Sequence, residues 1–157
     1  MRRYLIALTA ASSIVLVTAG FVAGAIHRQG ASTVKVALAP GGDPTKLTPS
    51  THVTKAGQVT FVVHNYSNIP HKSYGVPDAP EGHELVVLRT NLAPDKLRIN
   101  KRGNFAIETG RVGKPVVLDP GRSGSITLTL TPGKYVLLCN LLGHDATGQN
   151  AALEVVG

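Results

Sequence analysis

The chain carries its most informative run near the C-terminus: Tyr135-Val136-Leu137-Leu138-Cys139-Asn140-Leu141-Leu142-Gly143-His144-Asp145-Ala146-Thr147-Gly148-Gln149. The run begins as a dense apolar segment, which is typical of a buried strand. This segment ends at Cys139, the only cysteine in the 157 residues. His144 and Gln149 follow on the same loop. A thiolate and an imidazole with a weak axial oxygen donor are ligands that a copper ion accepts, so the run predicts a metal site.

The three side chains can meet at one ion only if the loop folds back, because five extended residues span about 17 Å. Gly143 and Gly148, each directly before a proposed ligand, supply the backbone freedom for that reversal. Two other interpretations of Cys139 remain open. It is either a small core residue or a nucleophile paired with a histidine, although no signature of a cysteine enzyme accompanies it. We expect a further histidine ligand from elsewhere in the chain.

Short β-rich runs separated by Gly and Pro predict an all-β domain. Residues 125–130 alternate polar and apolar side chains, as in a strand with one face on the core. Residues 39–50 are expected to be a loop and residues 91–114 a long surface excursion, with a short strand at 104–109. The expected strands are 33–38, 51–55, 59–65, 84–90, 116–119, 125–131, 134–139 and 151–156.

From Val59 to Val156 the chain resembles the cupredoxins, the blue type 1 copper proteins, of the sulfocyanin and rusticyanin kind. The resemblance rests on the Cys-x4-His-x4-Gln spacing and on three segments: VTFVVHN at 59–65, HELVVLRT at 83–90 and PGKYVLLCN at 132–140. The last ligand position holds Met in rusticyanin and Gln in stellacyanin, so the resemblance makes Gln149 the axial ligand. It implies a Greek-key β-sandwich that binds one copper ion.

The first histidine ligand has several candidates, because His52, His64, His71 and His83 all precede the cysteine. His52 and His64 fall within expected strands and are interpreted as surface or structural residues. His71 follows an Asn and a Pro as in several cupredoxins, whereas His83 leads into the family's ligand-bearing strand. We favour His83, with His71 as the alternative. Glu84 follows where many cupredoxins have Asn, so we expect another residue to donate to the sulfur. The expected metal ligands are therefore His83, Cys139, His144 and Gln149.

The N-terminus predicts export. Arg2 and Arg3 precede an uncharged stretch at 4–26, and Ala23-Gly24-Ala25 offers a cleavage site for a signal peptide. The stretch is also long enough for an uncleaved membrane anchor. In either case the domain lies outside the cytoplasm, in the periplasm or at the cell surface. The expected organisation is a signal peptide or anchor at 1–25, a linker with the first strand at 26–50 and a cupredoxin domain at 51–157.

The charge is modestly basic, with a formal net charge of +7 that becomes +5 when Arg2 and Arg3 are subtracted. Such a surface favours an acidic redox partner or an anionic membrane. No Lys/Arg run with interleaved aromatics is present, so nucleic-acid binding is not expected.

These observations predict an exported, monomeric electron carrier that is not an enzyme and passes single electrons between redox partner proteins such as a membrane oxidase or a cytochrome. The alternative is a copper-binding or copper-delivery protein, which the same ligands would serve. Copper enzymes need further copper sites rich in histidine, and this chain has no His-x-His pair.

Overall fold

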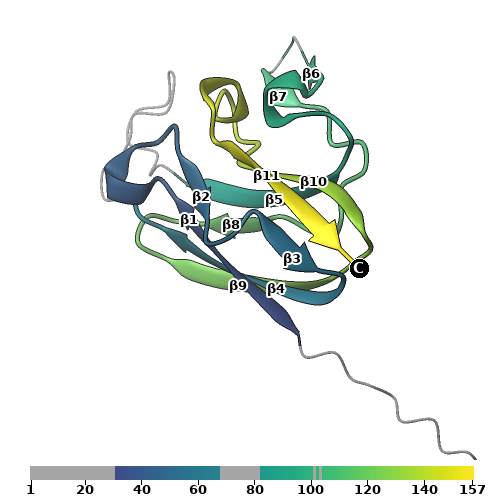
Figure 1. Cartoon of the computed structure of the whole chain (residues 1–157). Helices are drawn as coiled ribbons and strands as arrows, with labels where there is room; N and C mark the ends of the chain where they lie inside the picture. Colours follow the sequence, from purple (N-terminus) through teal and green to yellow (C-terminus); the bar gives the residue numbers. More distant parts are fainter. Residues whose placement is uncertain (1–30, 68–81, 101, 103) are drawn as a thin grey trace, which may run out of the picture.

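Two β-sheets pack face to face in the computed structural model, which describes residues 31–67, 82–100, 102 and 104–157 (Figure 1). One sheet has the strand order β2 (Leu47–Pro49), β1 (Ser32–Leu38), β4 (Gly57–Asn65), β9 (Ser123–Leu130). The other has the order β3 (Val53–Lys55), β11 (Asn150–Val156), β10 (Gly133–Leu138), β5 (His83–Arg89), β8 (Val116–Leu118). The remaining elements are a hairpin of β6 (Ile99–Asn100) and β7 (Phe105–Ala106), and the 3-10 turns η1 (Pro40–Gly42), η2 (Pro94–Lys96) and η3 (Asp145–Thr147). The predicted all-β sandwich is confirmed.

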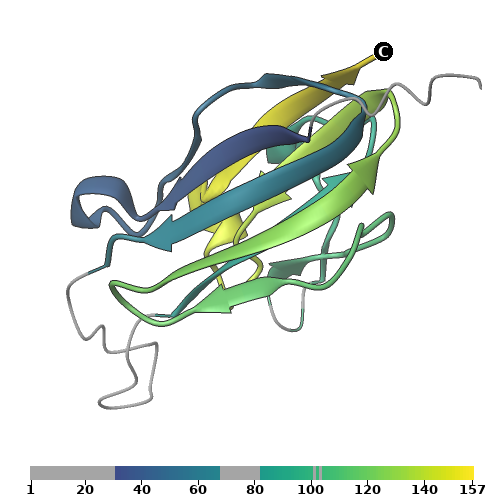
Figure 2. The same ribbon diagram turned by 90° about the horizontal axis from the view of Figure 1, so that it is seen from below.

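The core lies between the two sheets because the strands alternate apolar and polar residues. Along β4, for example, Val59, Phe61 and Val63 are buried whereas Val62 is 40% exposed. Figure 2 shows the sheet of β1, β4 and β9 in front of the sheet that holds β11. The buried residues of this core are Val34, Val36, Leu38, Leu47, Val59, Phe61, Val63, Leu85, Val87, Leu118, Leu128, Leu130, Tyr135, Leu137, Ala151, Leu153 and Val155.

Strands β5 and β10 are buried on both faces, which explains why their sequences are apolar without alternation. Their outer face is covered by the excursion at 91–114. There Val86, Leu88, Val136 and Leu138 form a second apolar cluster with Ala106 of β7. Cys139 therefore follows a strand that is fixed from both sides.

The structure differs from the sequence-based expectations in the short elements. The expected loop at 39–50 contains η1 and the edge strand β2, which pairs antiparallel with β1 through Val36 and Pro49. Proline is tolerated there because an edge strand leaves N–H positions unused. The strand expected at 104–109 is reduced to β7, which pairs with the unpredicted β6.

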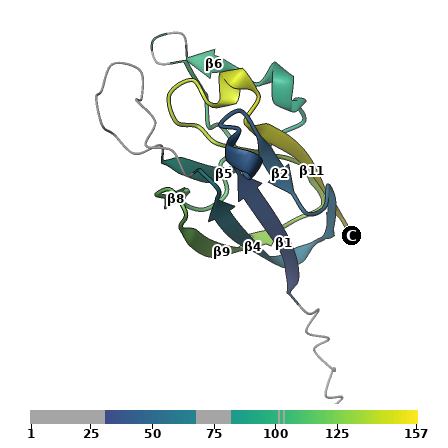
Figure 3. The same cartoon turned by 90° about the vertical axis from the view of Figure 1, so that its left-hand side faces the viewer.

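The sandwich includes residues before position 51. Strand β1 pairs in parallel with β4 from Ser32 to Leu38, so residues 26–50 contain two strands of the first sheet. Figure 3 shows the β6 hairpin at the end of the sandwich opposite to the start of β1. The expected signal or anchor at 1–25 and His71 lie outside the described residues. Among the residues the structure does describe, no helix is long and apolar enough to cross a membrane.

Candidate metal centre

Three metal-binding side chains meet between the ends of β5 and β10. His83 begins β5, Cys139 follows the last residue of β10, and His144 lies in the loop before η3. The Cys139 Sγ lies 3.2 Å from Nδ1 of His144 and 3.8 Å from Nδ1 of His83. All the ligand atoms of the three residues lie within 4.8 Å of one another. The sulfur and the two imidazoles are therefore close enough together to bind one metal ion.

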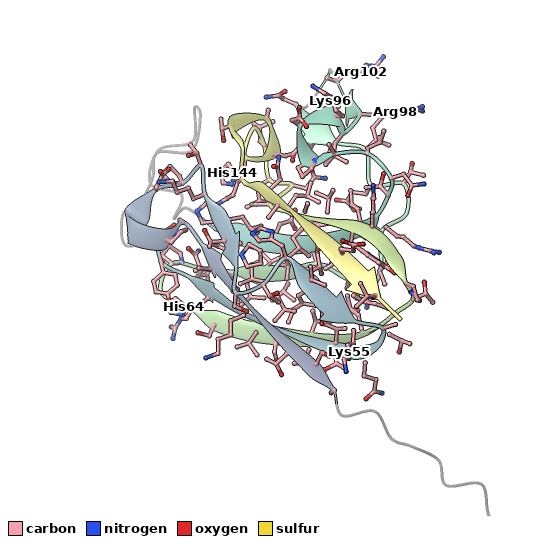
Figure 4. The ribbon with its side chains drawn as sticks, viewed as in Figure 1. Lys55, His64, Lys96, Arg98, Arg102 and His144 are labelled. Atoms are coloured by element: carbon pink, nitrogen blue, oxygen red, sulfur yellow. The ribbon has the colours of Figure 1, made fainter. Side chains whose placement is uncertain are left out.

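Burial makes the site asymmetric. His83, Cys139 and Gln149 are fully buried, whereas His144 is only half-buried. Figure 4 shows His144 on the loop between β10 and β11, at the end of the sandwich that also carries the β6 hairpin. His144 is therefore the one of these four residues through which the site can approach a partner.

Gln149 lies against the cluster with its amide oriented by the backbone. Its Nε2 donates a hydrogen bond to the carbonyl of Lys46 at 3.2 Å. The opposite end of the amide, Oε1, lies 3.0 Å from Nδ1 of His83. Because a carbonyl oxygen only accepts hydrogen bonds, Lys46 fixes which end of the amide faces the ligands. Oε1 of Gln149 is thus placed where it can act as a weak fourth metal ligand.

The sulfur of Cys139 accepts a hydrogen bond from the backbone N–H of Glu84 at 3.3 Å. We expected this donor to come from another residue because Glu replaces the Asn of many cupredoxins. The expectation was wrong, because a backbone N–H serves as the donor whatever the side chain is. The backbone N–H of Cys139 in turn donates to the carbonyl of Gln149 at 3.0 Å. Cys139 is therefore held by β5 through its sulfur and by the residue before β11 through its backbone.

The loop between Cys139 and Gln149 folds back, as expected from the positions of its two glycines. Gly143 and Gly148 adopt positive φ angles of 81° and 103°, which other residues rarely adopt. The N–H of Gln149 donates to the carbonyl of His144 at 3.1 Å and closes the turn. Asp145 is buried, which raises the pKa of its carboxyl group, while the Asn150 amide that donates to it at 2.8 Å opposes the rise. The loop is thus closed by its own backbone and by Asn150.

A buried carboxyl group lies next to the site. Burial raises the pKa of Glu84 and the negative charge of Glu108 raises it further, whereas the backbone N–H of Asn140 and the charge of Arg111 lower it. The side chain of Asn140 donates to Glu108 at 2.8 Å. Asn140 therefore links the residue after the cysteine to the excursion at 91–114.

The structure brings together His83, Cys139, His144 and Gln149, the residues expected as ligands. Of the other candidates, His64 lies on the outer face of the first sheet, where its Nδ1 is 2.6 Å from Oγ of Ser123. His52 is exposed and its Nδ1 is 2.9 Å from the carbonyl of Ala152. Sequence reasoning missed the contributions of Lys46 and of the Glu84 N–H. Both act through backbone atoms, for which a residue pattern gives no signal.

No known family model matches the sequence, and no curated protein matches it. Solved structures do. One is the dithionite-reduced auracyanin of the photosynthetic bacterium Roseiflexus castenholzii, with 25% identity and a TM-score of 0.53 over 82% of this chain and 100% of that one. Auracyanin B shows 20% identity and a TM-score of 0.53 over 81% and 90%. Reduced rusticyanin shows 16% identity and a TM-score of 0.53 over 78% and 77%.

The chain thus has the fold of the cupredoxins, and its His-Cys-His cluster fits a type 1 copper site. The donor set of one thiolate, two imidazoles and a weak axial oxygen agrees with such a site. Gln149 is placed consistently with the axial position.

Proposed function

We propose that this protein is an exported blue-copper electron carrier, a monomer that passes single electrons between redox partners outside the cytoplasm. The single observation that carries the proposal is the buried, converging arrangement of His83, Cys139 and His144. Copper held by these residues would supply the one-electron couple. The structural similarity to auracyanin and rusticyanin supports the same assignment.

The surroundings of the ligands suit an electron carrier because they restrict movement. Rapid electron exchange requires that the ligands change position little between the two oxidation states. Cys139 is held by the Glu84 N–H and by its own bond to Gln149, and Gln149 is held by Lys46. The polypeptide therefore imposes one ligand arrangement on both states.

The half-buried imidazole of His144 provides the route for the electron. Its neighbours in sequence are apolar: Leu142 is 49% exposed and Leu141 is partly exposed. A small apolar contact around one ligand allows close approach of a partner with the weak association of redox encounters. A membrane oxidase or a cytochrome is the kind of partner we propose.

Copper delivery is the competing function, and burial argues against it. A delivery protein must release its ion to an acceptor that reaches the ligands, but here His83, Cys139 and Gln149 are fully buried. Repeated cycling tests the difference. We expect the copper-loaded protein to bleach with ascorbate and recover its colour with ferricyanide over many cycles while bathocuproine removes little copper. Rapid loss of Cu(I) to the chelator would favour delivery.

Export rests on the N-terminal sequence, where Arg2 and Arg3 precede the uncharged stretch at 4–26. In bacterial cells that express the full chain with a C-terminal tag, an exported domain should either be released with the periplasmic contents or be digested by protease added to spheroplasts. A chain that starts at residue 26 should stay protected. Protection of the full chain would contradict export.

A further inference from the structure

The excursion at 91–114 carries much of the positive charge of the chain. Its sequence contains six Lys or Arg residues and two Asp or Glu residues, a net charge of +4 out of the formal +7. Two of the cations have partners, since Lys96 pairs with Asp95 at 2.7 Å and Arg111 pairs with Glu108. Arg98 and Arg102 are exposed and have no acidic partner within the part of the chain that the structure describes.

The hairpin that displays these arginines is attached to the loop of His144. The carbonyl of Asn104 accepts the backbone N–H of Gly143 at 3.3 Å, directly before His144. Within the hairpin, the Oδ1 of Asn100 accepts the N–H of Arg102 at 3.0 Å, and the carbonyl of Asn100 accepts the N–H of Asn104 at 2.8 Å. The backbone of Arg102 is therefore bonded to Asn100, and Asn104 of the same hairpin contacts the residue before the half-buried His144.

Figure 4 shows Lys96, Arg98 and Arg102 at the same end of the sandwich as His144. We call these three side chains the cationic rim. Lys55 lies at the opposite end in the same view. Exposed charges are screened over about 10 Å at 0.1 M salt, so charges at the end that holds His144 act on a molecule approaching it more strongly than Lys55 does.

We infer that the cationic rim steers an acidic redox protein to the edge of His144. The inference rests on the proposed function, because it assumes that electrons pass through that imidazole. Complementary exposed charges contribute mainly by raising the rate of encounter, by about 10- to 1,000-fold at low salt. The apolar Leu142 beside His144 then provides the contact, while the rim selects partners by charge.

Cytochrome c offers a matched pair of probes, because its lysine-rich surface becomes anionic when the lysines are succinylated. Stopped-flow spectroscopy would give the rate of electron exchange between the copper-loaded protein and each form. The rate of exchange with the anionic form divided by the rate with the cationic form separates the effect of charge from the intrinsic electron-transfer rate. At low ionic strength we expect this ratio to fall about tenfold or more in an Arg98→Glu/Arg102→Glu variant. Added salt should reduce the ratio of the wild-type protein.

A Lys35→Glu/Lys55→Glu variant is the control, because it makes the same change in net charge on the outer face of the first sheet and at the far end. We expect its ratio to change by no more than about twofold. An equal fall in both variants would assign the effect to net charge and overturn the inference, as would no fall in either. Equal wild-type rates with both probes at every salt concentration would also overturn it while leaving the electron-carrier function intact. Absence of a blue band and of exchange with either probe would overturn both.

Discussion

Replacement of Asn140 by Ala should detach the β6–β7 hairpin from the site. The Asn140 side-chain amide bonds to the backbone of Ala106 as a neighbouring strand would. Its Oδ1 accepts the N–H of Ala106 at 2.7 Å, and its Nδ2 donates to the Ala106 carbonyl at 3.0 Å. The same Nδ2 also donates to Glu108 at 2.8 Å. Within the hairpin, the N–H of Ile107 donates to the carbonyl of Arg98 at 2.7 Å. The backbone groups of Ala106 alternate with this bond and point to Asn140 instead.

The magnitude follows from the burial of Ala106, which is only 3% exposed. Two buried backbone groups left without partners cost about 1–3 kcal/mol each, and the bond to the partly exposed Glu108 adds about 1 kcal/mol. Water that enters the space of the deleted amide can bond to these backbone groups and so reduces the loss of stability. We therefore expect Asn140→Ala to lower the free energy of unfolding by about 2–4 kcal/mol, which corresponds to roughly 6–20 °C in Tm for a domain of this size.

Urea unfolding followed by circular dichroism measures the free energy, and hydrogen exchange measures the protection of the Ala106 amide. Asn91→Ala is the matched control, because Asn91 is exposed and its side chain makes no hydrogen bond within the described residues. A loss below about 0.5 kcal/mol together with unchanged protection of Ala106 would refute the role of Asn140 as a substitute strand.

Four further substitutions test the ligands and the carboxylate of Asp43. His83→Ala should destroy the copper site because it removes a strong ligand, whereas His71→Ala should leave the visible spectrum nearly unchanged; the reverse pattern would move the ligand role to His71. Gln149→Met should raise the reduction potential measured by voltammetry, because a thioether favours Cu(I) more than an amide oxygen does, by roughly 60 mV for each tenfold change in relative affinity; an equal or lower potential would exclude Gln149 as axial ligand. The pKa of Asp43 is lowered from 3.8 to about 2, mainly by hydrogen bonds from Thr45. Its carboxylate therefore stabilises the fold above pH 4, and this contribution is lost as the pH falls towards 2. The Asp43→Asn variant should therefore have a lower Tm than the wild-type protein at pH 6 in thermal scans. The difference in Tm should shrink as the pH falls from 4 towards 2. A difference that is the same at every pH would contradict the stabilising role of the Asp43 carboxylate.

Strand β9 was predictable because its residues alternate between polar and apolar, whereas β5 and β10 were predictable as dense apolar runs. Residues 125–130 alternate in the sequence and their structure follows that alternation, with Leu128 and Leu130 buried. Strands β2 and β6 were missed because three and two residues are too few to show a period. They exist only through their pairing with β1 and β7, which the local sequence does not encode.

Part of the site was predictable for a similar reason. Cys139, His144 and Gln149 share one short loop, and the glycines before His144 and Gln149 indicated that this loop could fold back and bring them together. His83 joins them through strand pairing: Leu138 pairs with Val86 in the antiparallel register of β10 and β5, which brings the start of β5 to the end of β10. The register of two strands cannot be deduced from the sequence of either strand alone. The choice of His83 over His71 therefore depended on the resemblance to the cupredoxins.

The visible spectrum of the purified full chain loaded with Cu(II) tests the central claim most directly. If the buried thiolate of Cys139 binds copper together with His83 and His144, charge transfer from sulfur should give an intense band at about 600 nm. The band should disappear in Cys139→Ser, since a hydroxyl is harder and far less acidic than a thiol, while the β-sheet circular dichroism stays the same. Absence of the band in the wild-type protein, or its survival in Cys139→Ser, would contradict the assignment of a blue-copper centre.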